Sequence, residues 1–454
     1  MASRSDAVVT PAQHGPVLVE YLNLDGTHSS KVLAPVKFDK GVEKGWNWPD
    51  LAFGLSLGND VQFGFDWGSW RGELPDVTLV PDLATLHHAQ IGPPARVIGE
   101  FYDNDGTRLA VCPRGLLRTV LDRLRGHGFS ASVAVELEVT LFQESYLEAN
   151  RQGYSGLTPL GGTSGAMLVT SKSAEYLAFV HRLVERLDDL AVPWEAWSDE
   201  AAVGQLELNL LPAPALDAAD HVMRAKQAVR DTAHELGHSA TFMSKWNYAE
   251  YGQGAHVNLS LLDESGCNAF SSGGAPTVAM RHAVAGLLHT LPGFSSLAMP
   301  LPNSYRRLAE LEGPPTTVSW GLDNKSCAVR AVVSPGPAAR LEHRLPGADS
   351  NPYLVLAGII AGICVGLEKE LTPAEPIVGL AWMRPDGHLV RLPHNILESA
   401  HALEHDADLR EVLGGEFVDY WVGTRRWEWR AFGESGATAT EVSAWETNRY
   451  FEQV

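Results

Sequence analysis

One stretch decides the fold: Val133-Ala-Val-Glu-Leu-Glu-Val-Thr-Leu-Phe142. Aliphatic residues fill its odd-numbered positions from Val133 to Leu141, whereas Glu136 and Glu138 share the opposite side. Side chains alternate across a strand, so same-face neighbours stand ~7 Å apart. The stretch therefore predicts a strand with one apolar face and one charged face. Unpaired charges are costly to desolvate, so the charged face is expected to bind something.

Four further stretches repeat this alternation. Their polar faces carry Gln205, Glu207 and Asn209 in Val203–Leu211; His256, Asn258 and Ser260 in Ala255–Leu262; Arg330 in Ser326–Val332; and Arg340, Glu342 and Arg344 in Arg340–Leu345. Carboxylates with an imidazole suit hard divalent cations, and arginines suit phosphate and carboxylate. Any one of these strands alone would read as a solvated face. The acidic residues alone could make a calcium site, but the arginines on the same faces instead favour a metal-bound phosphate.

Bulk properties narrow the class of protein. The chain has 454 residues, enough for one large core or two domains, and a formal charge of −20 that argues against nucleic acid and an anionic membrane as partners. Four scattered cysteines fit a reducing cytosol. The apolar run Tyr353–Leu367 is too short to cross a bilayer and, after Asn351 and Pro352, predicts a core helix. We expect a soluble, cytoplasmic protein.

The order of patterns along the chain predicts an α+β protein. Residues 1–15 are predicted to be disordered, and Val17 to Val97 holds short strand-like pieces, including Ser30–Phe38. Gly92-Pro93-Pro94 is interpreted as a domain boundary. Helical spacing follows at Arg114–Arg125, Ser173–Leu190, Ala218–Leu236 and Thr277–Leu291. A small β-rich domain is thus expected before a larger domain built on the charged sheet.

Seven ordered motifs resemble those of glutamine synthetase and its amide-ligase relatives, over nearly the whole chain. They are Val135-Glu-Leu-Glu138; Glu200-Ala-Ala-Val-Gly-Gln-Leu-Glu207; Ala240-Thr-Phe-Met-Ser-Lys245 with Gly252-Gln-Gly-Ala-His256; Asn303-Ser-Tyr-Arg-Arg-Leu308; Trp320-Gly-Leu-Asp-Asn-Lys-Ser326; Arg340-Leu-Glu-His-Arg344 with Asn351-Pro-Tyr353; and the closing Glu441–Tyr450. So many motifs in the family's order make a chance similarity untenable.

The resemblance implies an N-terminal β-grasp domain (16–105) and a C-terminal catalytic domain (106–454) with a curved antiparallel sheet. It also implies ATP, two or three Mg²⁺ or Mn²⁺ ions per site, and a homo-oligomer, a dodecamer of two hexameric rings. By resemblance, Glu138, Glu200 and Glu207 hold the metal at the substrate carboxylate; Glu136, His256 and Glu342 hold the metal on the nucleotide; Arg307 and Arg344, with Gly252 and Gly254, bind glutamate; Arg330, Arg340 and Ser260 serve the nucleotide; and Lys325 lies near the transferred phosphoryl group.

Departures from the family concentrate where ammonium binds. The D-G-S-S segment of ammonium users is missing, and Glu310-Leu-Glu312-Gly-Pro-Pro315 replaces their G-x-E-A-P flap, although a shifted alignment recovers Glu312. The aromatic residues of Phe63–Trp70 either line an amine pocket or belong to the β-domain core. The changes elsewhere are Lys325 for arginine, Tyr251 for asparagine, Asn258 for histidine, and Val390 where adenylylated enzymes have tyrosine.

The leading hypothesis is an ATP-dependent ligase that joins the γ-carboxylate of L-glutamate to an organic amine through a γ-glutamyl phosphate. The alternatives are an ammonia-using glutamine synthetase and a non-catalytic structural or regulatory member of the fold. The amine remains unnamed at this point. Its base could be Asp60, Asp66, Glu310 or Glu312, which the sequence does not rank.

Overall fold

The computed structural model describes residues 15–62, 64, 75–91, 95–161, 167–308, 313–384, 387–438 and 440–454. Its strands are β1 (Val17–Leu22), β2 (His28–Leu33), β3 (Trp46–Pro49), β4 (Asp76–His87), β5 (Ala95–Tyr102), β6 (Ser130–Phe142), β7 (Trp194–Asp199), β8 (Gln205–Leu210), β9 (Ala213–Pro214), β10 (Ser239–Thr241), β11 (Ala255–Leu262), β12 (Trp320–Leu322), β13 (Val329–Val332) and β14 (Arg340–His343). They form two sheets. The predicted disordered segment 1–15 lies outside the described residues except for its last position.

Most of the helices belong to the part of the chain that follows the first sheet. The helices are α1 (Pro35–Gly41), α2 (Pro113–Gly126), α3 (Tyr146–Arg151), α4 (Ala174–Asp189), α5 (Ala215–Leu236), α6 (Val278–Ala298), α7 (Pro352–Glu368), α8 (Ile396–His405), α9 (Ala407–Leu413), α10 (Gly415–Glu434) and α11 (Ala444–Tyr450), with short 3₁₀ turns η1 (Asp50–Phe53), η3 (Pro302–Arg307), η4 (Gly336–Ala338) and η5 (Ala381–Met383). The predicted α+β class is confirmed. In the described parts of the chain, no helix combines the length and apolar character needed to span a bilayer.

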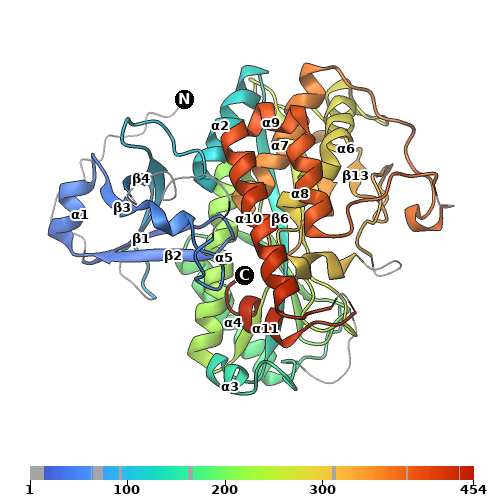
Figure 1. Cartoon of the computed structure of the whole chain (residues 1–454). Coiled ribbons are helices and arrows are strands. Elements are labelled where there is room, and N and C mark those ends of the chain that lie inside the picture. The colour runs from blue at the N-terminus through green and yellow to red at the C-terminus, as the bar shows by residue number, and fades with distance from the viewer. Residues whose placement is uncertain are drawn as a thin grey trace.

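The N-terminal sheet has the strand order β2-β1-β5-β4-β3 and lies to one side of the larger domain (Figure 1). The interpretation of Ser30–Phe38 as a single strand-like piece is wrong in its second half. Strand β2 ends at Leu33 and helix α1 begins at Pro35, because proline fixes a helical φ and lacks an N–H that the first helical turn leaves unpaired anyway.

The domain boundary proposed at Gly92–Pro94 is also wrong, because it would divide the first sheet. Those three residues lie outside the described ones, but β5 follows them and pairs in parallel with β1 and antiparallel with β4. The first sheet therefore continues to Tyr102 before α2 begins at Pro113. The boundary expected between residues 105 and 106 lies in this interval and stays a prediction.

The second sheet is built around β6. Its strand order is β12-β13-β14-β11-β6-β8-β7, with β9 and β10 also paired to β6, and only β12 and β13 run parallel. The apolar side chains Val133, Leu137 and Leu141 of β6 are fully buried. Val135 lines a small cavity together with residues of α5 and α7, so these helices lie over the apolar face. The charged face is left for the site.

The predicted helices form where their spacing indicated. Ser173, Thr277 and Asn351 cap α4, α6 and α7, each through a side-chain oxygen that accepts a backbone N–H. Helix α6 was predicted to end at Leu291, but it continues through Pro292 to Ala298. The buried side chains of its last turns pack into the core, and this packing outweighs the hydrogen bond that proline cannot donate.

Ion pairs tie the N-terminal sheet to distant parts of the chain. Glu20 on β1 is fully buried and accepts a hydrogen bond from Arg224 Nε on α5 at 2.9 Å. Asp25 pairs with Arg425 of α10. Asp60 pairs with Arg449 Nη1 of α11 at 3.0 Å. The carboxylates of Asp25 and Asp60 thus obtain their counter-charges from helices α10 and α11.

Candidate active site

Strand register brings the polar residues of the five stretches into one row. Glu138 lies opposite Glu207 on β8, and Glu136 lies opposite His256 on β11. Further along the sheet Asn258 lies opposite Glu342, which lies opposite Arg330. Residues directly opposite on neighbouring strands have side chains within contact range. The site is thus a consequence of pairing five strands whose polar positions are in phase.

Glu136, His256 and Glu342 meet at the centre of this row. They offer one ligand atom each, and these atoms all lie within 4.8 Å of one another. His256 Nδ1 is 3.5 Å from a Glu136 oxygen and 4.0 Å from a Glu342 oxygen. Burial, together with the charge of Arg344, lowers the pKa of His256, which favours the neutral imidazole that binds metals.

Built-in cations balance the two acids of this group. Glu342 accepts a hydrogen bond from Arg330 Nη1 at 2.7 Å and pairs with Arg344 through its other oxygen. Burial alone would raise the pKa of Glu136, but contacts with His256 and Asn258 and the charge of Arg344 lower it to about 2. The pKa of Glu342 is also lowered, against the effect of burial, by Arg344, His256 and Arg330. Both carboxylates are therefore ionised at neutral pH.

The second group of predicted acids, Glu138, Glu200 and Glu207, is arranged differently. Glu138 on β6 is buried, and Glu200 follows the last residue of β7. Glu138 accepts hydrogen bonds from the Gly254 N–H at 2.7 Å and from Gln205 Nε2 at 3.1 Å. Within the described residues this trio does not gather its oxygens as tightly as Glu136, His256 and Glu342 do.

Electrostatics nevertheless link these three carboxylates. Burial, with repulsion from Glu200 and Glu207, raises the pKa of Glu138 to about 8, although Arg307 and the Gly254 N–H act in the other direction. Burial and the charges of Glu136 and Glu200 raise the pKa of Glu207 to about 7. Lys325 is exposed, and its charge partly offsets the raised pKa values of both Glu200 and Glu207. The chain's own cations leave this group short of positive charge.

Two glycines make room for Arg307. A Cβ on Gly252 would come within 2.6 Å of Arg307 Cγ, and one on Gly254 within 2.7 Å of Arg307 Nη2 and 3.0 Å of His256 Nε2. Neither glycine has a left-handed φ, so the requirement is space rather than backbone freedom. Arg307 donates from Nη1 to the Leu345 carbonyl at 2.8 Å and from Nη2 to the Arg344 carbonyl at 3.1 Å. It is thus held between the Gly252–Gly254 loop and the end of β14.

Sequence reasoning missed the support beneath Arg307. Buried Asp349 accepts hydrogen bonds from Ser304 Oγ at 2.6 Å and from Ser244 Oγ at 2.7 Å. Ser304 lies on η3, which carries Arg307, and the Ser244 carbonyl accepts the Gln253 N–H at 2.8 Å. One carboxylate therefore fixes both segments that enclose Arg307. The available sequence signal for Asp349 was its position two residues before the Asn351-Pro-Tyr353 motif.

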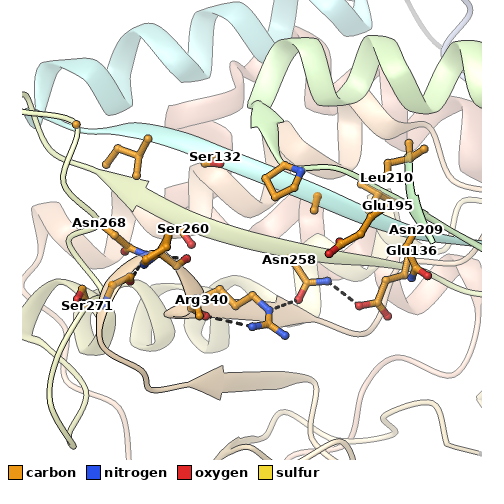
Figure 2. A pocket seen from close by; sticks show the side chains of 18 of the residues that line it. Ser132, Glu136, Glu195, Asn209, Leu210, Asn258, Ser260, Asn268, Ser271 and Arg340 are labelled. Atoms are coloured by element: carbon orange, nitrogen blue, oxygen red, sulfur yellow. Dashed lines mark hydrogen bonds between the residues drawn. The ribbon is translucent and has the colours of Figure 1, made fainter. Parts of the chain in front are cut away.

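A cavity of about 1100 Å³ adjoins the site on the side of the predicted nucleotide residues. Figure 2 shows Arg340, Asn258 and Glu136 joined in a chain along its wall. Arg340 Nε donates to Asn258 Oδ1 at 2.8 Å, and Asn258 Nδ2 donates to Glu136 Oε1 at 2.9 Å. Ser260 also lines the cavity and donates to the Ala339 carbonyl at 2.7 Å.

The other predicted residues divide into those outside the described parts of the chain and those whose surroundings are known. Asp66, the aromatic residues of Phe63–Trp70, Glu310 and Glu312 fall outside the described residues. Tyr251 is exposed beside Gly252. Asp60 accepts from Ser56 Oγ at 3.1 Å and pairs with Arg449, so its carboxylate already has partners within its own chain.

The residues fit divalent metal ions. Glu136, His256 and Glu342 supply two carboxylates, whose oxygens are the ligands that Mg²⁺ and Mn²⁺ prefer, and one neutral imidazole as a third donor. Glu138, Glu200 and Glu207 have pKa values raised by burial and mutual repulsion, which a bound cation would relieve. The first group would hold one ion and the second group another.

Comparison with known proteins agrees with this geometry. Residues 110–450 match the family described as glutamine synthetase, catalytic domain. The chain is 32% identical to gamma-glutamylethanolamide synthetase GlnA4 of Streptomyces coelicolor, over 452 residues that cover 99% of this chain and 95% of that protein. It is 31% identical to gamma-glutamylputrescine synthetase PuuA of Escherichia coli, covering 92% and 89% of the two chains.

A solved structure of a GmaS/ADP complex has the same fold, with a TM-score of 0.80, 24% identity and 96% of each chain covered. The chain belongs to the glutamine synthetase family. It is therefore an ATP-dependent glutamate ligase of this family, whose members also use divalent metal ions.

Proposed function

We propose that this protein joins the γ-carboxylate of L-glutamate to an organic amine, at the expense of ATP and through a γ-glutamyl phosphate. The observation that carries the reaction type is the single row of metal-type acids and arginines beside the large cavity. The choice of an organic amine rests on the relatives named for ethanolamine and putrescine products and on the missing D-G-S-S motif.

The residues take the following roles in the proposed reaction. Arg307 and Arg344 bind the glutamate carboxylates, and Gly252 and Gly254 let backbone approach the substrate. Arg330, Arg340 and Lys325 hold the phosphates and the transferred phosphoryl group. Bound Mg²⁺ or Mn²⁺ would neutralise the phosphates and polarise the γ-carboxylate.

The amine must lose a proton before it attacks the γ-glutamyl phosphate. An organic amine can bind without the carboxylates that hold ammonium in ammonia-using enzymes. An organic amine contributes apolar surface worth ~0.8 kcal/mol per buried methylene group. Asp60 is disfavoured as the base because Arg449 and Ser56 already engage it. Asp66, Glu310 and Glu312 remain candidates for that role.

Phosphate release with ATP and glutamate tests the amine choice directly. Ammonium, ethanolamine, an alkylamine and putrescine should be compared at equal concentration. We expect weak release with ammonium and clearly faster release with at least one organic amine. If ammonium is the best of all, the protein is an ammonia-using glutamine synthetase.

Two controls distinguish an active ligase from a non-catalytic member of the family. Glu342→Ala removes a ligand from the central group and should abolish phosphate release with every amine, while its circular dichroism stays that of the wild type. The wild-type chain should bind ATP only weakly without a divalent metal. Absence of both nucleotide and metal binding by the wild type would instead support a structural or regulatory role.

We also propose a dodecamer of two hexameric rings, in which a neighbouring subunit's N-terminal domain completes the site. Sedimentation velocity should show a single large particle. A stable monomer with full activity would contradict this assembly.

A further inference from the structure

A second group of metal-type side chains lies on helix α8, apart from the candidate active site. His401, Glu404 and His405 occupy positions i, i+3 and i+4 of its last turn, so they share one face. One ligand atom from each residue lies within 4.8 Å of the other two. The imidazoles are 70% and 63% exposed, so solvent and ions reach them.

A backbone contact fixes the tautomer of one of the two histidines. The Nδ1 atom of His405 is 2.9 Å from the backbone carbonyl of His401. A carbonyl can only accept a hydrogen bond, so this Nδ1 carries the proton and Nε2 keeps its lone pair for a cation. Metal-binding histidines commonly donate their second N–H to a carbonyl in this way. The two ring centroids are 4.1 Å apart, which brings both imidazoles to the same small volume.

Glu404 completes the group with a carboxylate. Its Oε2 lies 4.0 Å from His401 Nδ1. Arg426 of α10 holds the same carboxylate, with distances of 3.0 and 2.6 Å to its two oxygens. This pair is partly exposed, so solvent screening weakens it. A metal ion can therefore displace it.

The location favours positive charge. His401, Glu404 and His405 form the C-terminal turn of α8, where the helix dipole attracts cations. The chain as a whole carries a formal charge of −20. A divalent ion at this turn would lie near the negative end of the helix dipole as well as among its three ligands.

We propose that His401, Glu404 and His405 bind one Zn²⁺ ion per chain, with water completing a tetrahedral shell. Two imidazoles and one carboxylate suit Zn²⁺, whereas Mg²⁺ prefers an all-oxygen octahedral shell. The exposed side chains need only rotate to bring their ligand atoms to the ~2.0–2.2 Å bond lengths of zinc. Binding exchanges Arg426 for the metal on Glu404. The site is independent of the proposed ligase function.

Calorimetric titration of the full chain with Zn²⁺ tests the site, at mildly alkaline pH and with saturating Mg²⁺ present. The double variant His401→Ala/His405→Ala should bind one Zn²⁺ fewer per chain than the wild type. His289→Gln provides the matched control, because His289 is also exposed on a helix but pairs with Asp408. It should leave the zinc stoichiometry unchanged. Equal stoichiometry in the double variant and the wild type would overturn the proposal.

Two single variants test the roles of Glu404 and Arg426. Glu404→Gln should weaken zinc binding about tenfold, because it removes a charged ligand. Arg426→Met should strengthen binding several-fold, because it frees the carboxylate for the metal. If neither variant changes the affinity, Glu404 is not a ligand and the three-residue site is wrong. Thermal unfolding without zinc checks that every variant is folded.

Discussion

Glu20 and Glu138 are both buried glutamates on central strands of their sheets, yet their pKa values move in opposite directions. Burial would raise both. For Glu20, contacts with His28, Arg224 and Arg96 outweigh burial and lower the pKa to about 2. For Glu138, burial and the carboxylates of Glu200 and Glu207 prevail, and the pKa rises to about 8.

The difference lies in where the positive charge comes from. At the junction between the two sheets, the chain itself supplies cations for Glu20. At the candidate site the arginines are committed to Glu342 and to backbone carbonyls, and Glu138 receives too little positive charge. A buried acid whose counter-charge is missing from its own chain marks a place for a ligand, whereas one with built-in partners marks a structural junction.

The largest effect expected from this contrast is on activity. Glu138→Gln should reduce phosphate release by about a thousandfold or more, since it removes a predicted metal ligand. Its unfolding temperature without metal should stay about the same at neutral pH, because a buried glutamate with a pKa of about 8 is already mostly uncharged there. Activity and thermal unfolding of the same preparation measure both effects. Near-normal turnover would exclude Glu138 as a ligand.

Glu20→Gln should show the reverse pattern. It leaves Arg224 and Arg96 without a buried counter-charge, and breaking a buried pair costs about 3–5 kcal/mol of unfolding free energy. Denaturant unfolding measures the loss. Glu148→Gln is a matched control, because Glu148 is an exposed helix-capping residue. A loss no greater than that of the control would remove the contrast between the two glutamates.

Acid unfolding sharpens the same comparison. The pKa of Glu20 is about 2 in the folded chain and near its ordinary value of 4.5 in the unfolded chain. Its ionisation therefore stabilises the fold fully above pH 4.5, and this stabilisation is lost as the pH falls from about 4.5 to about 2. The wild-type unfolding free energy should fall more steeply over this interval than that of Glu20→Gln. Parallel pH profiles would contradict the assignment.

A smaller effect is expected at Gly254. The added methyl group of Gly254→Ala would meet Arg307 Nη2 at 2.7 Å and displace a predicted glutamate-binding arginine. The KM for glutamate should rise about 10- to 100-fold, whereas the KM for ATP should change less, because the new methyl group meets His256 Nε2 less closely, at 3.0 Å. Gly274→Ala, where a Cβ would meet nothing within 4 Å, is the control. An unchanged KM for glutamate would show that Arg307 does not bind it.

The smallest change is expected at Asp349. Asp349→Asn keeps the size of the side chain but replaces one acceptor oxygen with a donor, which disrupts one of the bonds from Ser304 and Ser244. The KM for glutamate should rise by about tenfold or less through movement of Arg307. Steady-state kinetics with Ser304→Ala should show a similar change. A fall in kcat with no change in KM would argue against positioning of Arg307.

Sequence patterns predicted the strands of the site well because one residue in two is apolar on each of them. The Ala255–Leu262 stretch matches β11 at both ends. The grouping of Glu136, His256 and Glu342 came from the family resemblance rather than from motif spacing, because antiparallel register joins strands far apart in sequence only once the fold is known. The resemblance supplied that register.

Other features depend on contacts that no local pattern records. Pro292 inside α6 would end an isolated helix, but the core packing of the next turn holds it. Asp349 gives no periodic signal, because it acts across segments that are distant in sequence. Likewise, the opposite pKa shifts of Glu20 and Glu138 depend on which arginines lie nearby, and each glutamate alone looks the same in sequence.

The pairing of Asp25 with Arg425 has a consequence for how the protein is made. The two residues are 400 positions apart. A ribosome adding about 5–20 residues per second needs about 20–80 seconds to travel between them. During that time the N-terminal sheet lacks both Arg425 and Arg449, so the nascent chain carries an unfinished junction. Its capture by chaperones should therefore persist until α10 and α11 have emerged.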